Sequence, residues 1–359
     1  MVITVRRLIS RGLVAAGLAA AVGLIASFAP RYQAGQQITG PSALSDADFW
    51  SLSGRLSEPD GEFVSRSGSP DNLLSNENAI SSVAAELAAR AKPGGIYLGV
   101  GPEQNFTYIA AMRPRLAFII DIRRGNLDLH LMYKALFGLS ATRSEFVERL
   151  FNRRPLPAST SKTTAAELMD AALGAAPADE AAFRANLSAI DAYLTRTHAL
   201  PLEKADLAGI EYVYRQFYRF GPDINYTSSI NGRSGARGSY ATIQSLTDPS
   251  GVSRTYLASD EAFAYVKAME AANAVVPVVG NFAGPKALRA IGSYLKEHGA
   301  VVGAFYVSNV EMYLRPNGVW PAFCANAASL PTDSTSVFIR PGRGGPRFAS
   351  IAAETSGCR

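Results

Sequence analysis

Residues 96–121 constrain the fold of this chain more than any other stretch. "IYLGV" (96–100) is a short apolar run that ends at a Gly-Pro turn. "NFTYIAAM" then has the spacing of a helix and stops before Arg113-Pro114, and "LAFIID" (116–121) is a second apolar run. A strand, a glycine turn, a helix and a second strand in this order begin a doubly wound α/β sheet.

The rest of the chain fits the same fold class. Apolar residues at three- and four-residue spacing predict a helical insert over about 125–273, and strands are predicted again at 275–280, 300–307 and 334–340. We therefore predict a doubly wound, mostly parallel sheet of at least five strands. It forms a Rossmann-like domain over 76–345, with a tail at 346–359.

The N-terminal segment has the composition of a membrane or export signal. Arg6, Arg7 and Arg11 precede an uncharged, apolar run over residues 12–30. A helix needs ~20 such residues to span a bilayer, and a basic start followed by an apolar run is also the layout of a secretory signal. We predict that 1–30 is a signal anchor or a signal peptide, that 31–75 is a tether, and that the globular domain lies outside the cytoplasm.

Several classes of site are disfavoured by residue usage. The two cysteines, Cys324 and Cys358, form no CxxC or Cys/His cluster, so no metal site is expected. In an oxidising compartment they could pair, but the sequence leaves this open. The net charge of +5 is spread along the chain with no Lys/Arg run between aromatic residues, so no nucleic-acid partner is expected.

The stretch "GVGPEQN" has features of a ligand loop. Glycines at the end of a strand let the backbone turn tightly and approach a ligand, and the next helix offers free N–H groups. Asp121 ends the second strand twenty residues after Gly101, where an acidic side chain accepts hydrogen bonds from ribose hydroxyls. The candidate cofactor-binding residues are Gly99, Gly101, Glu103, Asn105, Asp121, Arg123 and Asn281.

Neither of two known loop patterns is complete here. A dinucleotide site has G-x-G-x-x-G, but Gln104 stands at the third glycine. In the methyltransferase pattern Tyr97 replaces an acidic residue and Glu103 replaces a glycine, while Asn281 holds the position that ends the fourth strand. Glu103 and Asn105 can each either cap the helix or meet a ligand.

Three long strings carry a resemblance to a known family. "GVGPEQNFTYIAAMRPRLAFIIDIRRGNLDLHLMYKALF", "VVPVVGNFAGPKALRAIGSYL" and "FYVSNVEMYL" resemble an uncharacterised bacterial domain family with a class I S-adenosylmethionine methyltransferase-like fold. The resemblance covers most of residues 70–340 and implies that fold, but it brings no established reaction with it.

Three functions remain open at this stage. The first is methyl transfer with S-adenosylmethionine as the cofactor. The second is a non-catalytic envelope protein, attached to the membrane by the N-terminal helix, that binds a small molecule in the same crevice. The third is an enzyme on another substrate that uses Asp121, Arg123 and Glu311. Fold alone cannot choose among them, and the sequence leaves open whether the protein is an enzyme.

Overall fold

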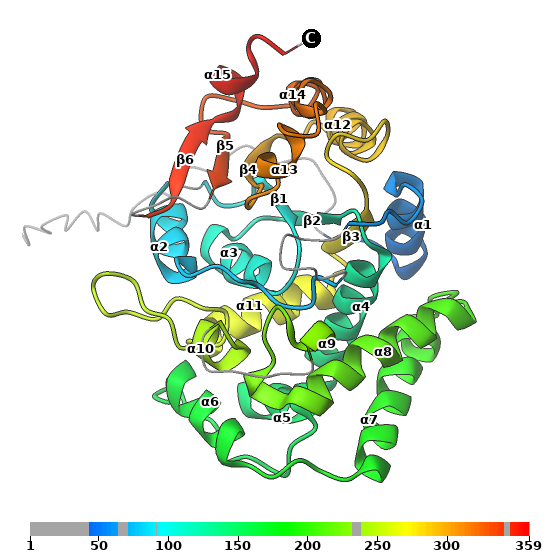
Figure 1. The fold of residues 1–359 in the computed structure, drawn as a ribbon, viewed down its shortest axis with the longest axis vertical. Helices are drawn as coiled ribbons and strands as arrows, with labels where there is room; N and C mark the ends of the chain where they lie inside the picture. The colour runs from blue at the N-terminus through cyan, green and yellow to red at the C-terminus, as the bar shows by residue number, and fades with distance from the viewer. Residues whose placement is uncertain (1–42, 64–70, 91, 232–237, 341–344, 359) are drawn as a thin grey trace, which may run out of the picture. The chain divides into compact units, whose positions relative to one another are not determined.

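The protein is described here by a computed structural model that covers residues 43–63, 71–90, 92–231, 238–340 and 345–358. This part of the chain is a mixed α/β structure around one six-stranded sheet (Figure 1). The strands are β1 (Ile96–Val100), β2 (Leu116–Asp121), β3 (Val275–Val279), β4 (Val302–Tyr306), β5 (Val337–Arg340) and β6 (Arg347–Ser350).

The sheet is mostly parallel and has the strand order β3-β2-β1-β4-β5-β6. The four pairings among β1 to β5 are parallel, and only β6 runs antiparallel to its neighbour β5. The predicted mostly parallel sheet is therefore confirmed, and β1 and β2 have the predicted bounds. Order along the sheet reverses at β1, because β2 and β3 extend to one side of it and β4 to β6 to the other.

Helices cover both faces of this sheet. Tyr97 of β1 contacts Asn105 of α3 (Gln104–Met112), whereas Phe118 of β2 packs edge-on against Tyr294 of α12 (Ala287–Glu297). Phe118 is in register with Leu98, the neighbour of Tyr97, and successive side chains of a strand point to opposite faces. The two helices thus lie on opposite faces, and Figure 1 shows α3 and α4 on one side of the strands and α12 and α14 on the other.

The helical insert lies between β2 and β3, as predicted. It packs through an aromatic cluster in which Phe106 of α3 contacts Phe137 and Tyr256. The helices from β2 to β3 are α4 (Arg124–Leu139), α5 (Arg143–Phe151), α6 (Ala165–Gly174), α7 (Glu180–Ala192), α8 (Lys204–Phe220), α9 (Ser228–Asn231), α10 (Tyr240–Gln244) and α11 (Asp260–Ala271), with a π-helical turn at Tyr193–Thr197 and a 3-10 turn at Gly221–Asp223. The remaining helices are α1 (Asp46–Leu56), α2 (Ile80–Arg90), α13 (Glu311–Leu314), α14 (Trp320–Ala328) and α15 (Ile351–Thr355).

The predicted tether is wrong where it can be compared with the structure, because α1 is packed onto the edge of the sheet. Its Phe49, Leu52 and Leu56 are buried, and Ser53 Oγ donates a 2.6 Å hydrogen bond to the carbonyl of Pro277 in β3. Just after the helix, the N–H of Glu58 donates to the carbonyl of Val279. The segment therefore covers an edge strand that would otherwise present unpaired backbone groups.

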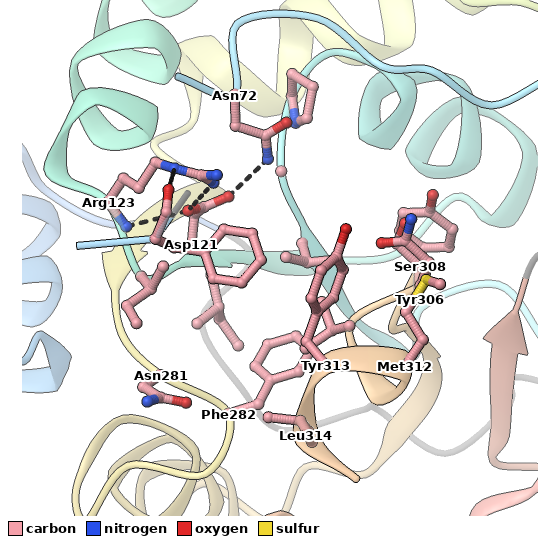
Figure 2. A pocket seen from close by; sticks show the side chains of 18 of the residues that line it. Asn72, Asp121, Arg123, Asn281, Phe282, Tyr306, Ser308, Met312, Tyr313 and Leu314 are labelled. Atoms are coloured by element: carbon pink, nitrogen blue, oxygen red, sulfur yellow. Dashed lines mark hydrogen bonds and ion pairs between the residues drawn. The ribbon is translucent and has the colours of Figure 1, made fainter. Parts of the chain in front are cut away.

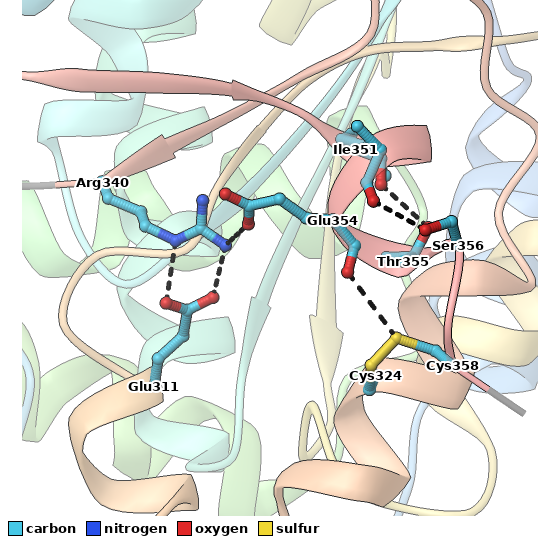
Figure 3. Close-up of a disulfide and its surroundings, with 9 residues drawn as sticks. Glu311, Cys324, Arg340, Ile351, Glu354, Thr355, Ser356 and Cys358 are labelled. Carbon is cyan, nitrogen blue, oxygen red and sulfur yellow. Dashed lines mark hydrogen bonds and ion pairs between the residues drawn. A yellow bond between two sulfur atoms is a disulfide. The ribbon is translucent and has the colours of Figure 1, made fainter.

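The predicted tail is also part of the fold, since β6 and α15 lie within it. The disulfide between Cys324 in α14 and Cys358 joins this region to the body of the domain, with Cα atoms 5.2 Å apart, within the usual range for such bonds (Figure 3). Arg340 of β5 binds Glu311 through two hydrogen bonds of 2.6 and 2.8 Å and also pairs with Glu354 of α15. The pairing that the sequence left open is thus present.

The predicted apolar segment 1–30 lies outside the described residues, as do residues 31–42. Among the helices of the described ranges, none combines the length and the apolar character that crossing a membrane requires.

Candidate functional site

A cavity of about 640 Å³ opens at the carboxyl ends of four parallel strands (Figure 2). Its wall includes Val100 at the end of β1, Asp121 at the end of β2, Gly280 after β3 and Tyr306 at the end of β4. The wall also includes residues 62–63, residues 72 and 75–77, which precede α2, Tyr226, and α13 with its neighbours. The cavity lies where the strand order reverses, the place at which open α/β sheets bind ligands.

Gly101 makes the turn from β1 into α3. Its φ of +80° is in the left-handed region, which glycine adopts without strain. A Cβ atom here would lie 2.9 Å from Nδ2 of Asn72, so the missing side chain also lets Asn72 approach the loop. The predicted backbone access at Gly101 is therefore present in the cavity wall.

Asn105 holds this loop together from behind the cavity. Its Nδ2 donates to the carbonyls of Val100, Gly101 and Pro102 at 3.1, 3.1 and 2.8 Å, and its Oδ1 accepts a 2.7 Å hydrogen bond from the hydroxyl of Tyr97. Gly99 leaves room for this network, because a Cβ there would collide with Asn105 Oδ1. Neither Gly99 nor Asn105 lines the cavity, and both shape the loop from behind it.

A buried histidine that the sequence analysis did not single out also supports the loop. His130 of α4 is 2% exposed, and its Nε2 lies 2.9 Å from the carbonyl oxygen of Gly101. Burial lowers the pKa of His130 to about 4, so the ring is neutral at pH 7. The neutral ring can donate its Nε2 proton to the Gly101 carbonyl, which fixes the turn further.

Glu103 faces away from the cavity. Its side chain is fully buried, and the backbone N–H of Ser75 donates to its two carboxyl oxygens at 3.1 and 3.3 Å. Burial raises the pKa of Glu103 to about 8. The residue therefore anchors the segment before α2 to the loop and does not line the cavity.

Asp121 is one of the carboxylates that line the cavity. Its Oδ2 accepts a 2.8 Å hydrogen bond from Asn72 Nδ2, and its Oδ1 accepts from the backbone N–H of Arg123 at 3.0 Å and from Arg123 Nη1 at 3.3 Å (Figure 2). A carboxylate has about four lone-pair positions. Three are used here, so Oδ2 can accept one more hydrogen bond from a ligand hydroxyl.

Arg123 is held beside Asp121 by a second set of contacts. Its Nε donates to the carbonyl of Phe63 at 3.2 Å, and its guanidinium lies 4.9 Å from the centre of the Phe63 ring. Among the described residues, none hydrogen-bonds to its buried Nη2. The two N–H groups of Nη2 are thus left for a ligand, while the charge of Arg123 is balanced by Asp121.

Asn281 lies in the cavity wall after β3, as predicted from its position in the sequence. Its Oδ1 accepts a 2.9 Å hydrogen bond from the N–H of Ala283, and its own N–H donates to Glu58 at 3.0 Å. These bonds fix the turn after the strand. The Nδ2 group has no partner among the described residues, so it is the part of the side chain that can serve a ligand.

A second polar cluster stands on another part of the wall, and the sequence analysis missed it. Glu77 Oε1 accepts hydrogen bonds from the hydroxyl of Tyr306 at 2.8 Å and from Ser308 Oγ at 2.9 Å. Ser308 adopts a φ of +48°, an unusual conformation for a residue with a side chain. In Figure 2 Ser308 and Asp121 lie on opposite sides of the cavity.

The structure therefore divides the predicted site residues into two groups. Gly101, Asp121, Arg123 and Asn281 line the cavity, whereas Gly99, Glu103 and Asn105 lie behind it. The wall residues that sequence reasoning missed include Asn72, Glu77, Tyr306 and Ser308.

Within the described residues, no three or more His, Cys, Asp or Glu side chains are grouped so as to hold a metal ion.

Comparison with known proteins adds a family. No curated protein matches the chain. A family model described as a domain of unknown function (DUF7790) matches residues 73–208 and 236–357, a range that includes every strand of the sheet and most of the cavity wall. Because the match covers more than half of the chain, the protein belongs to this DUF7790 family.

Proposed function

We propose that the protein has a methyltransferase-like fold and uses this cavity to bind S-adenosylmethionine for methyl transfer. The observation that carries the proposal is Asp121, which ends the second strand in the wall of the cavity with one lone pair of Oδ2 still available. An acidic side chain at this place in such a sheet suits a hydroxyl of a ribose. The parallel order β3-β2-β1-β4-β5 with an antiparallel strand beyond β5 also supports a methyltransferase-like fold.

The remainder of the wall supports a nucleoside ligand. The volume of about 640 Å³ falls within the range of about 300–1,000 Å³ that ligand pockets usually have. Phe63, Phe282 and Tyr313 bring aromatic surface on which a flat base can pack. Gly101 lets the backbone approach the ligand on the side of β1.

Calorimetric titration of the purified full chain with S-adenosylmethionine tests the proposal. The variant Asp121→Ala removes one charge-assisted hydrogen bond to the ligand, worth ~1.5–3 kcal/mol, so affinity should fall by about tenfold or more. Asp170→Ala is the matched control, because Asp170 is exposed on α6 and lies outside the cavity wall. If Asp121→Ala binds S-adenosylmethionine and its demethylated product as the unchanged protein does, with the same circular dichroism, the proposal is refuted.

A second candidate function is binding without chemistry, in a domain that lies outside the cytoplasm. The disulfide between Cys324 and Cys358 favours it, because such bonds persist in oxidising compartments. S-adenosylmethionine is made in the cytosol, so a domain outside would lack the cofactor. If this second function is correct, a reporter that is active only in the cytoplasm should show no activity when it is fused after residue 359. A strongly active reporter would exclude that location and remove the objection to methyl transfer.

A further inference from the structure

We propose that Glu77 binds the positively charged part of the ligand, so that the cavity selects a cationic nucleoside over a neutral or phosphorylated one. This inference rests on the proposed function and names the ligand class for the same cavity. It follows from the geometry of Glu77, from the charges around the cavity and from the position of Ser308, a hydrogen-bond partner of Glu77, opposite Asp121.

Glu77 is held in a fixed position with one oxygen left over. The hydroxyls of Tyr306 and Ser308 both donate to Oε1, and none of the described residues hydrogen-bonds to Oε2. Tyr306 is buried, with 1% of its surface exposed, so its side chain is a rigid support. The left-handed backbone of Ser308, just after β4, aims its Oγ at Glu77, and strained residues of this kind concentrate at functional sites.

The charges of the residues that line the cavity do not sum to zero. The described residues that line the cavity include four with a charge, namely Glu62, Glu77, Asp121 and Arg123. Asp121 and Arg123 neutralise each other at 3.3 Å. Glu62 and Glu77 have no cationic partner among the described residues, so the cavity carries an excess of negative charge that attracts cations and repels phosphate groups.

The two carboxylates define the two ends of a ligand. A nucleoside whose ribose hydroxyls reach Asp121 extends across the cavity toward Ser308, which lies on the opposite side (Figure 2). Whatever the ribose carries at its 5′ carbon then comes to Glu77. A sulfonium group at that point would be attracted by the negative charge of Glu77, whose Oε2 accepts no hydrogen bond from the described residues.

The experiment compares two ligands that differ by one methyl group and one positive charge. S-adenosylmethionine contains a sulfonium, and S-adenosylhomocysteine, the product of methyl transfer, contains a neutral thioether. Dissociation constants for both are measured by calorimetry on the full chain and on Glu77→Gln, whose amide oxygen still accepts hydrogen bonds from Tyr306 and Ser308. Glu86→Gln is the matched control, since Glu86 lies on α2, pairs with Arg90 and does not line the cavity.

The unchanged protein and Glu86→Gln should bind the sulfonium about tenfold more tightly than the thioether, and this preference should shrink at high ionic strength. In Glu77→Gln the two ligands should bind equally well. Tyr306→Phe removes a support of Glu77 but keeps its charge, so most of the preference should remain. Equal binding by the unchanged protein, or a preference that survives in Glu77→Gln, overturns this inference and leaves the proposed function standing. If neither ligand binds, both this inference and the proposed function are overturned.

Discussion

Replacing Glu103 with glutamine should make the stability of the protein less dependent on pH. Glu103 is completely buried behind the loop, and its carboxyl oxygens accept hydrogen bonds from the backbone N–H of Ser75. Burial raises its pKa from 4.5 to about 8, because a charged carboxylate is poorly solvated there. At neutral pH the folded protein therefore holds a proton on Glu103 that the unfolded chain has released.

The sign and size of the effect follow from this difference. The contribution of Glu103 to stability is complete below pH 4.5 and is lost progressively as pH rises toward 8, because in that window only the folded state keeps the proton. Each pKa unit corresponds to about 1.36 kcal/mol. Between pH 5 and pH 8 the free energy of unfolding should thus fall by about 3–4 kcal/mol on account of this group alone. Glutamine keeps an acceptor for Ser75 and cannot ionise.

Denaturant unfolding of oxidised protein at pH 5 and pH 8 measures this. The quantity to compare is the change in unfolding free energy between the two pH values, in the unchanged protein and in Glu103→Gln. Burial also raises the pKa of Asp128 and Glu270, but these groups are present in both proteins and cancel in the comparison. Glu86→Gln, a change of a half-buried side chain on α2, should leave the pH dependence as it is. Parallel pH profiles for Glu103→Gln and the unchanged protein would show that Glu103 does not hold its proton in the folded state.

Two further predictions concern stability. Reducing the disulfide, or introducing Cys324→Ser, should lower the free energy of unfolding by about 3–4 kcal/mol, because the bond closes a loop of 34 residues. Identical melting temperatures with and without reductant would contradict this. Gly99→Ala should lower the free energy of unfolding by about 1–3 kcal/mol, because the new Cβ collides with Asn105 Oδ1. In Gly174→Ala the new Cβ meets nothing within 4 Å, so this variant should be neutral or slightly stabilising. Equal melting temperatures for the two variants would refute the packing argument.

Much of the sheet could be predicted because its central strands are short, continuous apolar runs with clear boundaries in the sequence. β1 and β2 are runs of apolar residues bounded by glycine, proline or an acidic residue, and their observed bounds are those expected from the sequence. α1 was missed because Gly, Ser and Pro dominate its surroundings, while only Phe49, Leu52 and Leu56 show the helical spacing that buries it. β6 was missed because its four residues include Arg347 and Ser350 and it pairs only on one side.

The candidate site was predictable only where position along a strand decides the outcome. Asp121 and Asn281 lie at strand ends, and parallel strands bring such positions to one edge of the sheet. Asn72 and Glu77 come from a segment whose composition resembles a loop, and their placement depends on the contact between Ser75 and Glu103. Glu103 itself could not be placed, because the first turn of a helix can face either the ligand or the core.

The strand order has a consequence for the synthesis of the chain. β1 is a central strand, but one of its neighbours, β4, pairs with it through residues that follow it by roughly 200 positions. At about 5–20 residues per second, a ribosome needs about 10–40 s to make the intervening chain. During this time one edge of β1 has no partner, and an unpaired apolar strand edge can join to another chain. Newly made protein should therefore need chaperone protection for longer than its final stability would imply.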